Sequence, residues 1–441
     1  MPYTSHTEAE VQEMLKTIGV KKIEDLFDAV PPQILQKGHY NLPSGLSEQE
    51  TRQQVTSTAD KNNNPKISFL GGGYYQHFVP AHVRHLAGRS EFYTAYTPYQ
   101  PEISQGILQS IFEYQSMICR LTAMFATNAS MYDGSSASGE TCLMAANITR
   151  RKKILVARSV HPEYREVMKT YCWAKNLEIE EVAFDVQTGQ LDFGDLDGKL
   201  SEDVAGLFVQ SPNFFGVIED MPSLSAKTHE KGALSVQIIA EALSLGLLKP
   251  PGECEVDITV GDGQSYGLAV SGGGPSFGFM ATTEKYMRQL PGRIVGESED
   301  VDGKKAYVLT LQAREQHIRR EKASSNICTN QALCALTAVI YLSTLGQNLQ
   351  KLALINHQNA LQMQRQLTEQ KNWKRSFSAP FFNEFVVEAK DTQSVLRKLK
   401  KVGIAGGFDL GRSYPELEGR LLVCTTELIG QPEVQAYLAT V

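Results

Sequence analysis

The feature that most limits how this chain can fold is an alternation of short apolar runs with helical segments across its middle. The runs are rich in Val, Ile, Leu and Phe, and helical patterns such as residues 107–124 and 163–175 separate them. Apolar runs of this length between helices predict a mostly parallel sheet that helices cover on both faces. The expected strands are residues 153–157, 179–183, 204–210, 234–240, 258–261 and 278–281. The sequence therefore predicts an α/β fold, whose ligands bind beyond the carboxyl ends of the strands.

The chain has 441 residues, more than one ordinary domain needs, and segments of different character flank the alternating region. Residues 1–65 contain short amphipathic helices interrupted by prolines, which predicts an N-terminal helical arm that packs on a neighbouring domain or subunit. Residues 66–325 form the predicted large α/β domain. Residues 326–441 combine two long helices with two strands and a final helix, which predicts a small C-terminal α+β domain.

Charge and cysteine usage exclude several classes of protein. The formal net charge of −6 argues against nucleic acid as a partner, because neutralising phosphates needs a basic surface. The seven cysteines have no regular spacing, and His77, His82 and His85 lack the helical spacing of a zinc site and are expected on the surface or in loops. The apolar helix at residues 332–345 is too short to span a bilayer, and the N-terminus lacks a signal-peptide pattern. We therefore expect no metal, no membrane contact and a cytoplasmic location.

Three loops rich in glycine, serine or aromatic residues stand near the expected ligand edge. The first follows a predicted strand at residues 67–70 and reads GGGYY, and the second, residues 93–102, is crowded with tyrosines and prolines. The third, residues 128–140, is a run of small residues expected to lead into an apolar helix at residues 141–148. A turn of this kind at a helix N-terminus can hold an anion, because backbone N–H groups and the helix dipole converge there. Together the loops predict a ligand cleft.

Four motifs resemble those of a known enzyme family. They are residues 96–106 (YTPYQPEISQG), 128–130 (NAS), 291–296 (PGRIVG) and 314–331 (REQHIRREKASSNICTNQ). Together with the layout of arm, large domain and small domain, they resemble the glycine dehydrogenase (decarboxylating) family, the P-protein of the glycine cleavage system. The resemblance covers essentially the whole chain and implies the aspartate-aminotransferase-like fold of enzymes that use pyridoxal phosphate. That family occurs as one long chain with two halves or as two subunits, and this chain resembles subunit 1 of the split form.

The resemblance also marks the position of the cofactor's lysine, which this chain lacks. In the family's catalytic half a His-Lys pair shortly precedes a glycine run that ends in proline, and covalent attachment needs that amine. Counting back from residues 272–275 (GGGP) puts Gln264 at the lysine position, and Ser265, one residue further on, is no amine either. Glu241 follows the strand at residues 234–240, where it is either the acid beside the cofactor's ring nitrogen or a solvated helix-start residue. We therefore expect no covalent cofactor on this chain, and pyridoxal phosphate on the partner subunit.

Other lysines are poor substitutes for the missing amine. Lys249 precedes two prolines, Lys285 belongs to a polar helix, and Lys152 and Lys153 stand at the start of a strand, at the wrong end of the sheet. Solvated surface positions are expected for all of them.

The remaining candidates lie mostly on the aromatic loops. In aminotransferase-like dimers, loops of one protomer reach the partner's cofactor, so the resemblance implies that Tyr74, Tyr96, Tyr99 and Gln100 border the partner's active site. Ordinary core packing is the alternative for the tyrosines. Arg293, in the PGRIVG turn, is a further candidate for contacting a carboxylate or phosphate, with a structural ion pair as its alternative.

The resemblance implies a role as one subunit of glycine decarboxylase, inactive alone. With subunit 2, the complex would decarboxylate glycine through pyridoxal phosphate and pass the aminomethyl group to the lipoyl arm of H-protein. Two alternatives stay open: a stand-alone pyridoxal-phosphate enzyme that uses an unexpected lysine, and a structural or regulatory subunit. Assembly as a heterodimer or a heterotetramer, and ligand binding in the degenerate pocket, stay open as well.

Overall fold

The structure is a computed structural model that describes residues 6–34, 41–62, 64–323, 325–371, 373–389 and 391–441. The chain divides into two units, Met1–Asn63 and Asn64–Val441. Parts of the predicted arm (residues 1–5, 35–40 and 63) and Ser324 of the last motif lie outside the described residues.

The described part of the first unit is helical and leaves most of its apolar side chains exposed. It contains α1 (Glu8–Ile18), a 3-10 helix (Ile23–Phe27) and α2 (Glu48–Ala59). Ser47 begins α2 with a capping box, because its hydroxyl accepts from Glu50 N while the Glu50 carboxylate accepts from Ser47 N. Leu15 is buried, but the exposed side chains include Met14, Ile18, Ile23, Leu26, Phe27, Ile34, Leu42, Leu46 and Val55. So little burial cannot hold helices this short together on its own.

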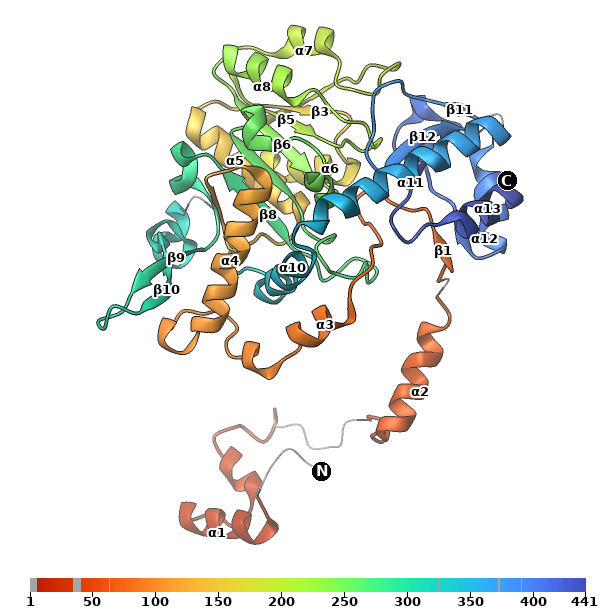
Figure 1. Cartoon of the computed structure of the whole chain (residues 1–441). Helices are drawn as coiled ribbons and strands as arrows, with labels where there is room; N and C mark the ends of the chain where they lie inside the picture. The colour runs from red at the N-terminus through yellow and green to blue at the C-terminus, as the bar shows by residue number, and fades with distance from the viewer. Residues whose placement is uncertain (1–5, 35–40, 63, 324, 372, 390) are drawn as a thin grey trace. The chain divides into compact units, whose positions relative to one another are not determined.

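A seven-stranded sheet forms the core of the second unit (Figure 1), in the order β2-β8-β7-β6-β5-β3-β4. The strands from β7 to β4 are mutually parallel, whereas β8 runs antiparallel to both of its neighbours. Their bounds are β2 (Ala126–Thr127), β3 (Lys153–Ala157), β4 (Glu178–Val182), β5 (Val204–Gln210), β6 (Leu234–Ile239), β7 (Ile258–Asp262) and β8 (Gly278–Thr282). The predicted α/β fold is confirmed.

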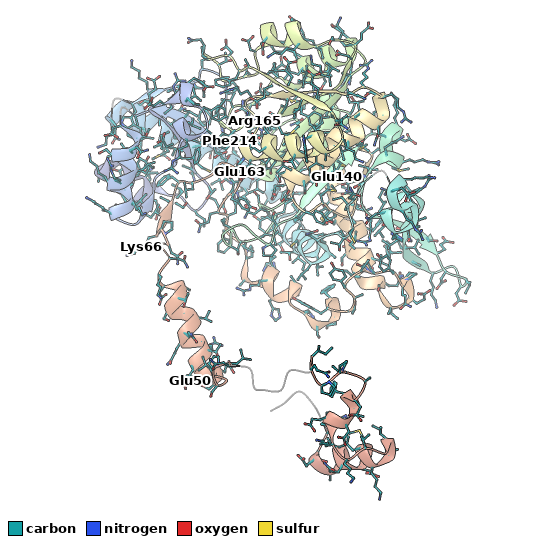
Figure 2. All side chains as sticks on the ribbon, turned by 180° about the vertical axis from the view of Figure 1, so that it is seen from behind. Glu50, Lys66, Glu140, Glu163, Arg165 and Phe214 are labelled. Atoms are coloured by element: carbon teal, nitrogen blue, oxygen red, sulfur yellow. The ribbon has the colours of Figure 1, made fainter. Side chains whose placement is uncertain are left out.

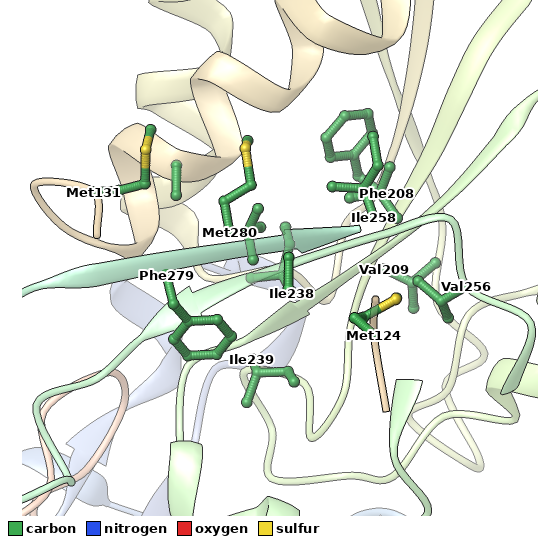
Figure 3. Packing of buried hydrophobic residues seen from close by; sticks show 14 of the residues in the cluster. Met124, Met131, Phe208, Val209, Ile238, Ile239, Val256, Ile258, Phe279 and Met280 are labelled. Atoms are coloured by element: carbon green, nitrogen blue, oxygen red, sulfur yellow. The ribbon is translucent and has the colours of Figure 1, made fainter. Parts of the chain in front are cut away.

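Helices cover both faces of this sheet, since every residue of β5, β6, β7 and β8 is buried. Figure 3 shows Met280 and Ile238 on one face, with Phe279 and Ile239 on the other, as the period of two in a strand requires. Helix α5 packs against β5 to β8 and α6, and α4 packs against β2, β8 and α10. The helices are α3 (Ala81–Ala87), α4 (Gln105–Thr122), α5 (Gly134–Thr149), α6 (Pro162–Ala174), α7 (Phe193–Lys199), α8 (Met221–Glu230), α9 (Gln316–Arg319) and α10 (Ala332–Leu345).

A four-stranded antiparallel sheet, in the order β11-β12-β15-β14, organises the C-terminal region. Phe69, Phe385, Val423 and Tyr437 pack in its core. The elements are β11 (Lys374–Arg375), β12 (Glu384–Glu388), β14 (Phe408–Asp409), β15 (Arg420–Cys424), α11 (Asn348–Lys371), α12 (Thr392–Lys401) and α13 (Gln431–Thr440). Strand β1 (Ile67–Ser68) pairs in parallel with β13 (Ile404–Ala405), so the glycine-rich loop leaves from this region.

The large sheet meets the small one through aromatic and charged contacts. The Phe214 ring, after β5, lies against Phe408 and Tyr414, and Arg165 of α6 donates a hydrogen bond to Tyr414 Oη at 3.3 Å. Phe214 and Arg165 are labelled side by side in Figure 2. Helix α10 packs into the core of the large sheet, and the division at 325/326 therefore stays a prediction.

Two local predictions were wrong, and one element was not predicted. Helix α5 begins at Gly134 rather than at Thr141, because the Asp133 carboxylate accepts from Ser136 N at 2.7 Å and caps the helix there. The strand expected at residues 67–70 comprises two residues. The antiparallel hairpin of β9 (Ile294–Glu299) and β10 (Lys305–Thr310), which projects from the body in Figure 1, was not expected at all.

Candidate functional site

The loop that follows β1 crosses the carboxyl ends of three strands of the large sheet. His161 Nε2, beyond β3, lies 2.7 Å from Gly72 O, and Tyr75 N donates to Gln264 Oε1, beyond β7, at 3.0 Å. His77 Nε2 lies 3.2 Å from Glu241 Oε2, beyond β6. The structure thus places the first predicted ligand loop against Gln264 and Glu241, at the edge where α/β proteins bind ligands.

Gln264 stands in the first loop after β7 and both ends of its side-chain amide are used. Gln264 is 2% exposed to solvent. Its Oε1 accepts from Tyr75 N, and its Nε2 donates to Leu268 O at 2.7 Å. Position 264 therefore offers a ligand no amine. The Gln264 amide found there makes its hydrogen bonds within the chain.

Glu241 begins a 3-10 helix (Ala242–Gly246) and is buried, so the solvated alternative for it is wrong. It faces His77, whose side chain is 2% exposed and also lies 2.9 Å from Glu427. Burial lowers the pKa of His77, but the two carboxylates outweigh burial and raise it to about 9. His77 is therefore cationic at neutral pH and joins the large sheet edge to the C-terminal region. His77 lies in a loop, as the sequence predicted, but its side chain is buried there rather than solvated.

Asp262 ends β7 and places its carboxylate against the start of α5. Its Oδ2 accepts from Gly134 N at 3.3 Å, and its Oδ1 accepts from Ser276 Oγ at 2.7 Å and from Gln264 N at 2.9 Å. Burial raises the pKa of Asp262 to about 6, so the group is an anion at neutral pH. With Gln264 in place of an amine and a carboxylate at the helix start, these residues do not fit covalently bound pyridoxal phosphate.

Tyr99 and Arg293 form a second cluster, beyond the carboxyl end of β2. Arg293 is 3% exposed, its carbonyl accepts from Ala129 N, and its Nη2 donates to Tyr99 Oη at 2.9 Å. The guanidinium lies 5.3 Å from the centre of the Tyr99 ring, which also contacts His317. Within the described ranges, Arg293 Nε and Nη1 have no hydrogen-bond partner and no carboxylate pairs with this side chain. A buried cation with unused donors is suited to a bound anion.

Tyr96 and Gln100 share the exposed loop of Tyr99, and Tyr74 lies elsewhere. Tyr96 is 86% exposed and Tyr99 is 52% exposed, whereas Gln100 is exposed at the start of a 3-10 helix (Pro101–Ile103). Tyr74 is half-buried at the chain's own sheet edge, where burial and then Asp262 and Asp133 raise its pKa. The core-packing alternative therefore does not describe Tyr96.

Two residues at this edge escaped sequence reasoning. Glu384, in β12, is buried and accepts from Tyr75 Oη at 2.8 Å and from Gly72 N at 2.6 Å. Burial raises the pKa of Glu384 to about 7. Glu384 is 309 positions from Tyr75, so no local sequence pattern predicts that the two residues meet. Asp262 had a signal, since it stands between two glycines directly after an apolar strand.

The lysines considered as substitutes lie away from the carboxyl edge. Lys249 and Lys285 are exposed, and Lys285 stacks over Tyr286. Lys153 starts β3, at the amino edge, where it pairs with Glu180 at 2.8 Å.

Across the described ranges, no three His, Cys, Asp or Glu side chains are grouped to hold a metal ion. No single described helix is long and apolar enough to cross a membrane, although α10 and α11 pass that test as a pair bent by 90°.

Comparison with known proteins shows the family. The chain matches the family described as glycine cleavage system P-protein over residues 1–441. It is 49% identical to the probable glycine dehydrogenase (decarboxylating) subunit 1 of Desulforamulus reducens, over 100% of this chain and 99% of that one. The same-named protein of Moorella thermoacetica is also 49% identical, over 100% and 98% of the two chains.

Solved structures agree with this assignment. A crystal structure of glycine decarboxylase (P-protein) of the glycine cleavage system, in inhibitor-bound form, superposes with a TM-score of 0.92 at 43% identity, covering 100% of this chain and 99% of that one. The aspartate aminotransferase of Thermus thermophilus shares the fold alone, with a TM-score of 0.59 at 13% identity over 85% and 97% of the chains. The chain belongs to the glycine cleavage system P-protein family.

Proposed function

We propose that this chain is the first subunit of a two-subunit glycine decarboxylase and completes an active site whose pyridoxal phosphate is held by subunit 2. The observation that carries the proposal is Gln264, a buried amide with both polar ends bonded inside the chain. The chain is 49% identical over its full length to proteins named glycine dehydrogenase (decarboxylating) subunit 1, which supports the reaction. The loop after β7 offers no amine at Gln264, which supports a cofactor held by the partner.

The contribution of this chain to the reaction centres on Arg293. Two of its donors have no hydrogen-bond partner among the described residues although the side chain is buried. A buried donor left unsatisfied costs about 1–3 kcal/mol, and more when it is charged, so an anion in the assembled enzyme would stabilise this arrangement. The glycine carboxylate and the cofactor phosphate both have the required charge.

Tyr99 acts as a positioning residue for that guanidinium. Its hydroxyl accepts from Arg293 Nη2, and its ring lies beside the guanidinium face. The half-exposed ring and the exposed Tyr96 then face outward, where they can border a partner's cleft. When bound on the partner, pyridoxal phosphate supplies an electron sink for the bond electrons left as carbon dioxide departs. In this proposal Tyr74, Tyr96, Tyr99, Gln100 and Arg293 belong to the surface that meets subunit 2.

Glycine and the lipoyl arm of H-protein are the proposed small-molecule and carrier partners of the complex, which would pass the aminomethyl group to that arm. Assembly as one pair or two pairs of subunits follows from the split form of the family. The cytoplasmic location stays a prediction from the sequence.

The test is to purify this chain and subunit 2 separately and together, then to measure glycine decarboxylation and visible absorbance. We expect activity only from the mixture and cofactor absorbance only from subunit 2. Activity and absorbance from this chain alone would instead identify a stand-alone enzyme. Full activity from subunit 2 alone would identify this chain as a structural or regulatory subunit.

A further inference from the structure

The N-terminus of α5 lies directly against the end of β7. Two of the first three backbone amides of this helix donate to carboxylates: Ser136 N to Asp133 Oδ1 at 2.7 Å, and Gly134 N to Asp262 Oδ2 at 3.3 Å. Asp133 is an ordinary N-cap from the helix's own sequence. Asp262, 128 residues away, brings a second carboxylate to the place where a helix holds an external anion.

The first turn of α5 packs closely on its neighbours, so Asp262 is held against it. A methyl group in place of the Gly134 hydrogen would clash with Tyr164 Oη and lie 3.0 Å from Asp262 N. A methyl group at Gly278, at the start of β8, would clash with Asp133 O. Asp262 is itself buried and accepts two further hydrogen bonds, from Ser276 Oγ and Gln264 N. Its carboxylate therefore occupies a fixed position rather than a mobile one.

The charges around the helix start also oppose a bound phosphate. Burial raises the pKa of the Tyr74 and Tyr164 hydroxyls, and Asp262, Asp133 and Glu163 raise both further. Glu163, labelled in Figure 2, lies in the first turn of α6. Asp262 is the largest of these charge effects on both tyrosines, and a phosphate at Gly134 N would meet its like charge first.

We propose that Asp262 is an internal anion that fills the phosphate position at the N-terminus of α5 and closes this sheet edge to phosphorylated ligands. The loss of a lysine at Gln264 is then only half of the difference from a cofactor-bearing chain. Restoring the amine alone does not restore binding, because the anion position remains filled. This inference concerns the chain's own pocket and does not depend on the role proposed for Tyr99 and Arg293.

The first test measures how inorganic phosphate changes the melting temperature of the full chain, with potassium chloride at matched ionic strength as reference. Asp262→Ala should show a saturable rise of about 2 °C or more, because a ligand that binds only the folded state stabilises it. Asp262→Ser, which keeps a hydroxyl to accept from Gly134 N, should behave alike and serves if the alanine variant does not fold. The wild type and Asp257→Ala should not respond. Asp257 is the matched control, because it precedes β7 at the opposite edge and accepts from Ser235 N.

The second test uses pyridoxal phosphate with borohydride reduction and peptide mapping. Gln264→Lys alone should show less than a tenth of the label at position 264 that the double variant Gln264→Lys with Asp262→Ala shows. Equal labelling of the two variants would overturn the proposal, as would a phosphate response in the wild type or none in both Asp262 variants. Because neither test uses decarboxylation, a negative result here would leave the proposed function of the complex standing.

Discussion

The sheet edge and the Tyr99–Arg293 cluster differ in how completely their polar groups are satisfied. At the edge, Gln264, Asp262 and His77 each have internal partners, and the surrounding charge is mainly acidic. In the second cluster the buried Arg293 guanidinium is cationic, and two of its donors have no partner within the described residues. A chain that carried its own active site would leave the edge open and the outer cluster satisfied. The reverse pattern supports our proposal that the ligand-binding capacity of this subunit is directed at a partner.

Arg293 gives the largest effect that we expect. Arg293→Ala should lower glycine decarboxylation by the assembled complex by about 10²–10³-fold, because it removes a buried cation placed for an anion. Arg158→Ala is the matched control, since Arg158 pairs with Glu416 at 2.8 Å far from this cluster and should leave the rate nearly unchanged. Equal rates for both variants in complexes of equal assembly would mean that the unused donors have no role in the reaction.

His77 tests the other side of the comparison, the closed edge. Its pKa is raised from 6.5 to about 9, so its ion pairs contribute stability fully below pH 6.5 and lose that contribution as pH rises through 9. The shift corresponds to about 3 kcal/mol. The melting temperature of the wild type should fall between pH 7 and pH 10 more steeply than that of His77→Gln, which has no charge to lose. Parallel curves would show that the pairing with Glu241 and Glu427 adds nothing to folding.

Tyr99 and Tyr96 test which tyrosine hydroxyl near Arg293 matters for the reaction. Tyr99→Phe and Tyr96→Phe each remove one hydroxyl, which costs on the order of 1 kcal/mol of stability or less. Decarboxylation should fall roughly a hundredfold if the hydroxyl acts in the reaction. We expect the larger loss for Tyr99, because its hydroxyl accepts from Arg293. If both variants assemble normally and keep the full decarboxylation rate, the two hydroxyls have no role in the reaction.

The N-terminal arm gives the smallest effect. Its exposed apolar side chains, including Ile18, Phe27 and Leu42, are expected to be covered by subunit 2. Hydrogen exchange in the arm, residues 1–65, should slow when subunit 2 is added. Rapid exchange that stays the same with and without the partner would show that the arm does not wrap it.

Local patterns predicted the fold better than they predicted the site. The strands at residues 153–157 and 204–210 match β3 and β5 residue for residue, because buried parallel strands consist of continuous apolar runs. The hairpin of β9 and β10 was missed because residues 291–296 were interpreted as a turn and Glu297 to Glu299 at the end of β9 are polar. The start of α5 was missed because a run of Gly and Ser has low helix propensity, which the Asp133 cap and burial override.

The candidate site could be predicted only where its residues follow a strand. Gln264 and Glu241 do so, and their loops come together as parallel topology requires. The partners that set their chemistry come from distant sequence. Glu427 reaches His77 across 350 positions, and Glu384 reaches Tyr75 across 309, so only the folded chain shows that the edge is closed.

Borohydride labelling of the assembled complex with pyridoxal phosphate tests the central claim most directly. After reduction and peptide mapping, we expect the label on lysine peptides of subunit 2 and none above background on this chain, because Gln264 offers no amine. A label of one per chain on a lysine of this subunit, at Lys249 or Lys285 for example, would contradict the claim that its ligand-binding capacity is directed at the partner.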